Sequence, residues 1–222
     1  MLAFPLCFYV GKQTFPSERS ALFCLRRWKS MKEMEEKILR EAEILPGNIL
    51  KVGGFLNQQL DVAFLLRMGR EIAGTFLSTG VTKVLTVETS GIPLAFTVAQ
   101  ALGVNAAYAK KHASANLSGD TYSAEVYSYT HGKTYTILLS RDYLREGDRV
   151  LIVDDFLACG NAVRGLMSIA QQAGATVVGV AAAVEKGFQG GGDELRQRGL
   201  PVCSLAVIDE FTAEGGIRFR AC

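Results

Sequence analysis

The chain has 222 residues, of which 49% are hydrophobic, so it is long and apolar enough to bury one substantial core. Its 24 basic and 22 acidic side chains leave a formal net charge of +2, which gives no electrostatic reason to expect nucleic acid as a partner. The five cysteines are odd in number and lack metal-ligand spacing, which argues against a disulfide framework or a zinc site and favours a reducing, cytoplasmic location. Because the chain has only two histidines, we do not expect a catalytic triad or a metal cluster built on histidine. Chemistry is expected instead from carboxylates, lysines and backbone amides.

The first thirty residues differ in character from the rest. Met1 to Val10 is apolar and uncharged, and basic residues follow this stretch rather than precede it. A secretory signal needs its positive charge before the apolar stretch, and a membrane span needs roughly 20 apolar residues, so we expect neither a signal nor a membrane partner. Because Met31 opens a charged amphipathic helix, we predict that residues 1–30 are an extension outside the fold and that residues 31–222 form one domain.

From Met31 onward, helix and strand signals alternate. Pro46 and Gly47 stop a first helix, Asp61 is the expected N-cap of a second, and Pro93 and Gly103 bracket a third. The predicted elements up to residue 109 are a helix over 32–44, an extended piece over 49–52, a helix over 61–77, a strand over 83–88, a helix over 93–102 and a strand over 104–109.

A long polar segment, 112–133, interrupts this alternation, and segments of this length inside a compact domain are usually functional covers or contain a hairpin. We predict a mobile loop there, followed by a strand over 125–129. The alternation resumes with strands over 134–139 and 148–153, a helix over 163–173 and a strand over 176–184. Strands separated by helices of this length predict an α/β fold with a mostly parallel sheet, helices on both faces, and ligands at the carboxyl ends of the strands.

The most informative segment is 154–162, which follows the apolar run 150–153 and precedes a helix. Its small residues let backbone N–H groups approach an anion, and the helix N-terminus adds partial positive charge. Asp154 and Asp155, at the predicted strand end, offer acceptors to hydroxyls or to the water shell of a divalent metal. A plain strand-to-helix turn with two capping aspartates is the alternative. Against it stands a second glycine loop, 88–92, at the end of another strand, because paired anion-binding turns suit a ligand with phosphates at both ends.

These segments resemble the phosphoribosyl pyrophosphate (PRPP) signature of the type I phosphoribosyltransferases. The motif Val-Asp-Asp-Phe-Leu-Ala-x-Gly, together with five shorter segments, is similar to the bacterial xanthine phosphoribosyltransferases within that family. Those segments are Leu50–Val52, Phe55–Asn57, Glu88–Ile92, Ala109–His112 and Val184–Gln189. The similarity covers Met31 to about Phe211. Ala162, where most type I enzymes have Thr, agrees with this subfamily, whereas Cys159 replaces a commoner Asn.

The resemblance implies an α/β type I phosphoribosyltransferase fold, a mostly parallel central sheet flanked by helices, with a small hood subdomain from about 31–61 plus the C-terminal tail. It implies that xanthine and PRPP react, with Mg²⁺ as the PRPP complex, to give xanthosine 5'-monophosphate and diphosphate in purine salvage, and that the enzyme is a homodimer. Asp154 and Asp155 would be catalytic, accepting from the ribose hydroxyls and stabilising positive charge on the sugar ring; no direct protein ligand to the metal is expected. PRPP would be bound by Ala158, Cys159, Gly160, Asn161 and Ala162, and its pyrophosphate by Thr89, Ser90, Gly91 and Lys111.

The resemblance places xanthine on Leu50, Asn57 and Lys186. A lysine ammonium can only donate, which suits the carbonyls of xanthine and rejects an amino group such as that of adenine. Asn57 can donate and accept, and Leu50 could offer an apolar wall or a backbone group. Phe156 and Phe188 could pack on the purine, but with twelve phenylalanines in the chain core packing is the safer interpretation.

Two alternatives stay open. The same chemistry could act on guanine or hypoxanthine, or the chain could be a PRPP-sensing regulator. The regulator is disfavoured because residues 1–60 show neither a basic recognition helix nor a large surplus of positive charge.

Overall fold

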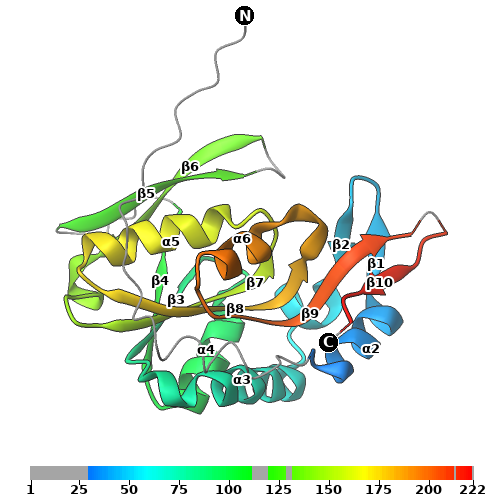
Figure 1. The fold of residues 1–222 in the computed structure, drawn as a ribbon, viewed down its shortest axis with the longest axis horizontal. Helices are drawn as coiled ribbons and strands as arrows, with labels where there is room; N and C mark the ends of the chain where they lie inside the picture. The colour runs from blue at the N-terminus through cyan, green and yellow to red at the C-terminus, as the bar shows by residue number, and fades with distance from the viewer. Residues whose placement is uncertain (1–29, 112–119, 129–131, 213, 222) are drawn as a thin grey trace, which may run out of the picture.

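The computed structural model describes residues 30–111, 120–128, 132–212 and 214–221; nearly all of the predicted extension, and much of the predicted cover segment, lie outside these ranges. Its centre is a six-stranded sheet in the order β10-β9-β8-β7-β3-β4 (Figure 1). All neighbours are parallel except β10, which pairs antiparallel with β9. The strands are β3 (Lys83–Val87), β4 (Asn105–Ala109), β7 (Arg149–Leu157), β8 (Thr176–Lys186), β9 (Val202–Phe211) and β10 (Ile217–Phe219).

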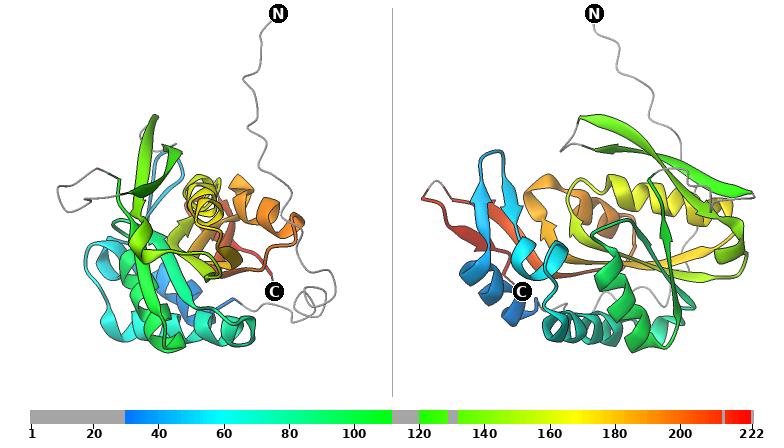
Figure 2. Two further views of the ribbon diagram at one scale, coloured as in Figure 1. Left: turned by 90° about the vertical axis from the view of Figure 1, so that its left-hand side faces the viewer. Right: turned by 180° about the vertical axis from the view of Figure 1, so that it is seen from behind.

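Helices cover both faces of this sheet, as predicted (Figure 2). One face carries α2 (Lys32–Glu41), α3 (Val62–Phe76) and α4 (Ile92–Leu102), and the other carries α5 (Asn161–Gln172) and α6 (Gly191–Gln197). The alternation of side chains along β7 explains the two layers. Leu151 and Val153 are buried with the first group of helices, whereas Val150 and Ile152 are buried with the second. The strands are therefore apolar on both faces, as parallel strands usually are.

Two antiparallel hairpins stand outside the central sheet. β1 (Glu43–Leu45) pairs with β2 (Ile49–Lys51), and β5 (Thr121–Ser128) pairs with β6 (Lys133–Ser140). The second hairpin packs on α5 and reaches β4 through a bridge between Lys110 and Leu138. The short helical turns are η1 (Gly53–Asn57), η2 (Leu77–Thr79), η3 (Arg141–Tyr143) and η4 (Gly187–Gln189). Among the described residues, no helix is long and apolar enough to cross a membrane.

The beginning of the domain packs on the main core. Met34 and Ile38 of α2 are fully buried with side chains of α3 and α4, and the Met31 N–H donates to the Leu205 carbonyl of β9 at 2.8 Å. Asp61 caps α3 as predicted, accepting the Phe64 N–H at 3.0 Å. The first helix, however, ends at Glu41 and not at residue 44. Residues 43–45 leave the helix because they pair with β2.

The strand that carries the two aspartates is longer than predicted. β7 keeps pairing with β8 as far as Leu157 opposite Glu185, so Asp154 and Asp155 lie inside the strand rather than at its end. The apolar run stops at residue 153, but backbone pairing continues regardless of side-chain polarity. The loop shrinks to residues 158–160, and Asn161 already belongs to α5.

Candidate active site

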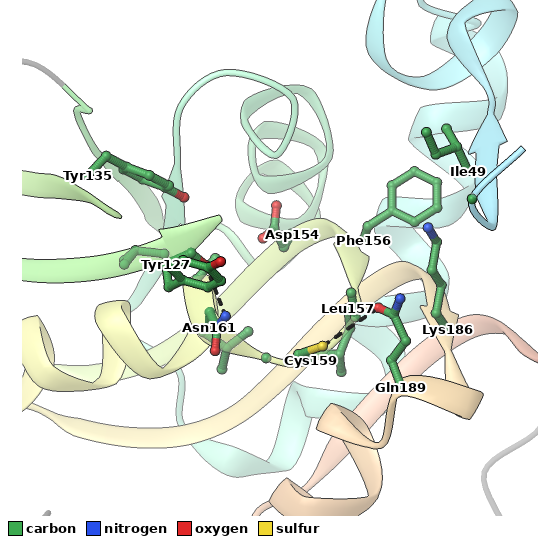
Figure 3. A pocket seen from close by; sticks show the side chains of 16 residues that line it. Ile49, Tyr127, Tyr135, Asp154, Phe156, Leu157, Cys159, Asn161, Lys186 and Gln189 are labelled. Atoms are coloured by element: carbon green, nitrogen blue, oxygen red, sulfur yellow. Dashed lines mark hydrogen bonds between the residues drawn. The ribbon is translucent and has the colours of Figure 1, made fainter. Parts of the chain in front are cut away.

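A pocket of about 410 Å³ opens at the carboxyl ends of β7 and β8, where sheets of this kind bind ligands (Figure 3). Four segments form its wall: the β7–α5 loop, the turn of the β1–β2 hairpin, the β5–β6 hairpin, and η4. All five residues predicted for the phosphate loop, 158–162, line this pocket together with Asp154 and Lys186. The structure thus brings the predicted phosphate loop, one predicted catalytic acid and the predicted base-binding lysine together.

The β7–α5 loop is braced on both sides. Gly160 has a φ of 81°, a left-handed conformation that glycine adopts without strain. The Gly191 N–H donates to the Ala158 carbonyl at 3.1 Å, and a Cβ on Gly191 would lie 2.3 Å from that oxygen. The Asn161 amide donates to the Tyr127 carbonyl at 2.9 Å, which ties α5 to the β5–β6 hairpin. The loop ends at a 12-residue helix whose first N–H groups have no partner within the helix, which favours an anion there.

The two carboxylates have different surroundings. Asp154 faces the pocket, is only 6% exposed, and accepts the Asp155 N–H at 2.9 Å. Burial raises the pKa of Asp154 well above its usual value, and the charge of Asp155 raises it further, whereas Lys111 lowers it. Asp155 is buried beside the pocket, where it accepts from the Ser90 hydroxyl at 3.0 Å and from the Asn57 amide at 3.3 Å. Asp155 therefore links β7 to two loops that are far away in the sequence.

The second glycine loop, 88–92, lies against these carboxylates. The peptide bond between Glu88 and Thr89 is cis, and Thr89 is exposed. A Cβ on Gly91 would lie 2.9 Å from Oδ1 of Asp154, so this approach requires glycine. Together with the hydrogen bond from Ser90 to Asp155, this contact places the predicted pyrophosphate loop next to both acids, although the loop does not line the pocket itself.

Lys111 lies between this loop and the β5–β6 hairpin. Its N–H donates to the Glu88 carboxylate at 2.6 Å, and its Nζ lies 5.4 Å from the centroid of the Tyr135 ring. Tyr135 lines the pocket, where burial and then the charge of Asp154 raise the pKa of its hydroxyl. Lys111 is thus a positive charge near the buried acid, outside the pocket wall.

The other end of the pocket is built around Lys186. Its ammonium donates to the Asn48 carbonyl at 2.9 Å, in the turn of the β1–β2 hairpin, and lies 5.7 Å from the centroid of the Phe156 ring. Burial lowers the pKa of Lys186 from its usual value. Gln189 of η4 lies beside it, and its side-chain oxygen accepts a long contact of 3.9 Å from the Cys159 thiol (Figure 3).

Two residues predicted to bind the base do not line the pocket. Leu50 is buried in the core, and its neighbour Ile49 lines the pocket instead, because successive residues of a strand point to opposite sides. Any contact between Leu50 and a ligand must therefore come from its backbone. Asn57 is exposed in η1 and is held by Asp155. Phe188 packs edge-on against Phe211, with 5.5 Å between ring centroids, and is outside the pocket wall.

The pocket also contains residues that the sequence did not predict for the site, among them Ile49, Tyr127, Tyr135 and Gln189. The two tyrosines come from a hairpin that the sequence predicted only as a loop and separate strands. Nothing in the strand pattern alone shows that this hairpin folds back over α5. Gln189 lies within a segment that carries the family resemblance, so that segment was the one available signal.

The acidic groups suit a metal that arrives with its ligand. Within the described ranges, no group of three or more His, Cys, Asp or Glu residues could hold a metal ion. Asp154 nevertheless presents carboxylate oxygens to the pocket, and magnesium and its water shell prefer oxygen ligands of this kind. A magnesium ion bound to a diphosphate fits, because the diphosphate supplies further oxygen ligands.

A parallel sheet, a buried acid on its central strand, a small-residue loop at a helix N-terminus and a facing glycine loop define the site of a phosphoribosyltransferase. Residues 63–198 match the family model of the phosphoribosyl transferase domain, and the chain belongs to this family. The resemblance inferred from the sequence and the predicted fold family are thereby confirmed.

The chain is also similar to individual members of the family that carry curated names. The chain is 49% identical over 193 residues to the xanthine phosphoribosyltransferase of Bifidobacterium adolescentis, covering 86% of this chain and 100% of that protein. It is 47% identical over 178 residues to the xanthine phosphoribosyltransferase of Bacillus cereus, covering 80% and 90%.

Solved structures support the fold alone. The APRTase of Giardia lamblia complexed with 9-deazaadenine matches with a TM-score of 0.67 at 22% identity, over 81% of this chain and 97% of that one. The adenine phosphoribosyltransferase of Thermoanaerobacter pseudethanolicus matches with a TM-score of 0.60 at 23% identity, over 80% and 99%.

Proposed function

We propose that this chain converts xanthine and PRPP to xanthosine 5'-monophosphate and diphosphate, as a pentosyltransferase of purine salvage. The observation that carries the proposal is that one pocket joins the loop 158–162, the buried Asp154 and Lys186. The curated names of relatives at 49% and 47% identity support xanthine as the base.

The phosphoribosyl half of the site would act mainly by electrostatics. Backbone groups of 158–162 and the N-terminus of α5 would hold the 5'-phosphate, while Asp154 and Asp155 accept from the ribose hydroxyls. As a base nitrogen bonds to C1 of the ribose, the bond from C1 to diphosphate oxygen breaks and its electron pair leaves with diphosphate. The proton of the base nitrogen passes to the diphosphate or to solvent. Positive charge develops on the sugar ring, so the nearby carboxylates lower the barrier without a protein nucleophile.

The leaving group would meet the loop 88–92, through Thr89, Ser90 and Gly91, and Lys111 beside it. Because the Ser90 hydroxyl donates to Asp155, the same carboxylate contacts the loop and would act beside the reaction centre. Magnesium carried by PRPP would neutralise the departing diphosphate. We assign no direct protein ligand to this metal, and the carboxylates would face its water shell.

The base would lie at the Lys186 end of the pocket. The ammonium donates to a carbonyl of xanthine, and the Asn48 carbonyl beside it can accept an N–H of the base. An amino group in place of the carbonyl would face the ammonium without a bond, a mismatch of about 1 to 3 kcal/mol. Phe156 would contact the purine face, Asn57 would read an edge near Asp155, and Leu50 would contribute through its backbone.

Three further parts of the proposal concern the whole protein. The hood would consist of α2, the β1–β2 hairpin and the C-terminal tail, with residues 1–30 as an extension. A homodimer is the assembly that the resemblance to the bacterial xanthine phosphoribosyltransferases implies. A cytoplasmic location is supported by cysteines without a disulfide pattern. Light scattering of the pure protein tests the dimer.

The deciding experiment is turnover of four bases, xanthine, guanine, hypoxanthine and adenine, with PRPP and magnesium. We expect kcat/KM to be highest for xanthine and lowest for adenine. Equal or better turnover of guanine or hypoxanthine would remove the xanthine assignment while leaving the reaction class. Absence of turnover with every base, with PRPP binding intact, would favour a PRPP-sensing protein instead.

A further inference from the structure

Thr86 lies in β3, in the interior of the sheet, and is 1% exposed. Among the residues that the structure describes, its hydroxyl is the one buried side-chain nitrogen or oxygen without a hydrogen-bond partner. Such groups are rare, because an unpaired hydroxyl gives up its bonds to water without replacement. An unpaired group in the middle of the sheet therefore needs a reason.

The Thr86 hydroxyl lies near the carboxylate of Asp154. β3 pairs with β7, the strand that carries Asp154. A Cβ on Gly91 would lie 2.3 Å from the Thr86 hydroxyl oxygen and 2.9 Å from Oδ1 of Asp154, so both oxygens border the same point. The Thr86 hydroxyl is therefore a neighbour of the Asp154 carboxylate.

Asp154 can use such a donor. Its Oδ1 accepts the N–H of Asp155, and the remaining lone pairs of an ionised carboxylate accept further bonds. Burial and the charge of Asp155 raise the pKa of Asp154, so the ionised form needs additional donors or positive charge. Lys111 supplies charge from one side, and Thr86 lies under the loop 88–92 on another.

We propose that Thr86 is a positioning residue, whose hydroxyl donates to the Asp154 carboxylate when that carboxylate faces the ribose. The proposal rests on the phosphoribosyl transfer proposed above. Thr86 does not line the pocket, so it acts on the substrate only through Asp154. The hydroxyl, which has no hydrogen-bond partner in the structure, gains one when the carboxylate faces the ribose.

Thr86→Val removes the hydroxyl and keeps the branched shape. With both substrates saturating, we expect kcat to fall about tenfold, the effect of one hydrogen bond to a charged group, while the KM for xanthine is unchanged. The melting temperature should stay equal or rise, because the variant no longer buries an unpaired hydroxyl. Thr86→Ser retains the donor and should keep kcat within about twofold of the wild type. A purely structural role would lower stability and activity together.

The matched control is Thr97→Val in α4. The Thr97 hydroxyl is also buried, but it already donates to the Leu94 carbonyl at 2.9 Å. This variant should lose stability and keep kcat, the reverse of Thr86→Val.

Wild-type kcat in Thr86→Val would overturn the proposal, and so would a Thr86→Ser variant that is as slow as Thr86→Val. If Thr86→Val does not fold, Thr86→Ala takes its place, and a folded Thr86→Ala with wild-type kcat has the same meaning. Failure of the wild-type enzyme to turn over any base would instead overturn the proposed function, before any variant is compared.

Discussion

The two ends of the pocket are built in different ways. The end proposed to bind the phosphoribosyl group comes mostly from one continuous segment, β7, its loop and the start of α5, and is completed by a second strand-end loop. The base end is assembled from the β1–β2 hairpin, the end of β8 and η4, and its central hydrogen bond, from Lys186 to the Asn48 carbonyl, joins residues 138 positions apart. The difference teaches that the residues proposed to bind phosphate are neighbours in the sequence, whereas those proposed to bind the base meet only through the fold.

The same contrast appears in the energetics of the two ends. Asp154 is buried in the sheet with an acidic neighbour, so the folded protein holds a carboxylate in an unfavourable place. Lys186 is half-buried and keeps a backbone hydrogen-bond partner, so burying its charge costs less free energy. Variants at the two ends should therefore differ both in kinetics and in stability.

The largest effect is expected at the phosphoribosyl end. Asp154→Asn removes the negative charge beside the developing positive charge, and kcat should fall at least about a hundredfold. Steady-state turnover of xanthine at saturating PRPP measures this. Asp142→Asn, an exposed aspartate of η3, is the matched control and should change kcat little. A loss of less than about threefold in Asp154→Asn would contradict the proposed role.

The same substitution should alter how stability depends on pH. The folded-state pKa of Asp154 is raised, so the wild type loses stability as pH rises from the unfolded value of about 3.9 towards the folded value. Asparagine does not titrate. Asp154→Asn should therefore be more stable than the wild type at pH 7, and this margin should shrink as pH falls towards about 4. Denaturant unfolding at several pH values tests this, and a margin independent of pH would contradict it.

At the base end, Lys186→Met should raise the KM for xanthine about ten- to a hundredfold, because a donor to the base is lost while the apolar stem is retained. The affinity for PRPP should not change, since the phosphate loop is separate. Calorimetric titration of PRPP, alongside base kinetics, separates these effects. Lys51→Met, at an exposed lysine of β2, is the control. Equal losses of PRPP and xanthine affinity would show that the two ends are not independent.

A smaller effect is expected for the aromatic wall. Phe156 lines the pocket beneath Lys186, whereas Phe188 packs on Phe211 outside it. Phe156→Leu should raise the KM for xanthine about five- to tenfold through loss of ring contact with the purine, and Phe188→Leu should leave it nearly unchanged. Comparing the two KM values checks this. A larger increase of KM in Phe188→Leu than in Phe156→Leu would contradict the prediction and place the base on the other side of η4.

The smallest effect is expected in the phosphate loop itself. Cys159→Asn should leave kcat/KM within about twofold, because the proposed cradle uses backbone groups that do not depend on this side chain. Kinetics at limiting PRPP measure it. A larger loss would show that the thiol contact with Gln189, across the boundary between the two ends, contributes to binding.

The local patterns in the sequence accounted for most of the fold. Apolar strands, glycine stops and the Asp61 cap located the main helices and strands, because these signals act over a few residues. These patterns gave the wrong element at residues 43–45 and the wrong strand end beyond residue 153. At both places the backbone conformation depends on pairing with another strand and not on the local sequence of apolar residues. The same limit explains why Tyr127 and Tyr135 were missed, since both reach the pocket only through the fold of their hairpin.

The sequence by itself determined that the proposed phosphate loop and the acidic pair lie together, since adjacent residues on a strand, loop and helix do so wherever the chain folds. The tertiary structure decided what those residues face. It buried Asp154 beside Gly91 and Thr86, and it placed Ser90 and Asn57 where they donate hydrogen bonds to Asp155. It also placed Lys186 within hydrogen-bond distance of the Asn48 carbonyl and buried the Leu50 side chain in the core. The physical reason is that burial and pairing are set by segments far apart in the chain, whose meeting depends on the packing of the whole sheet.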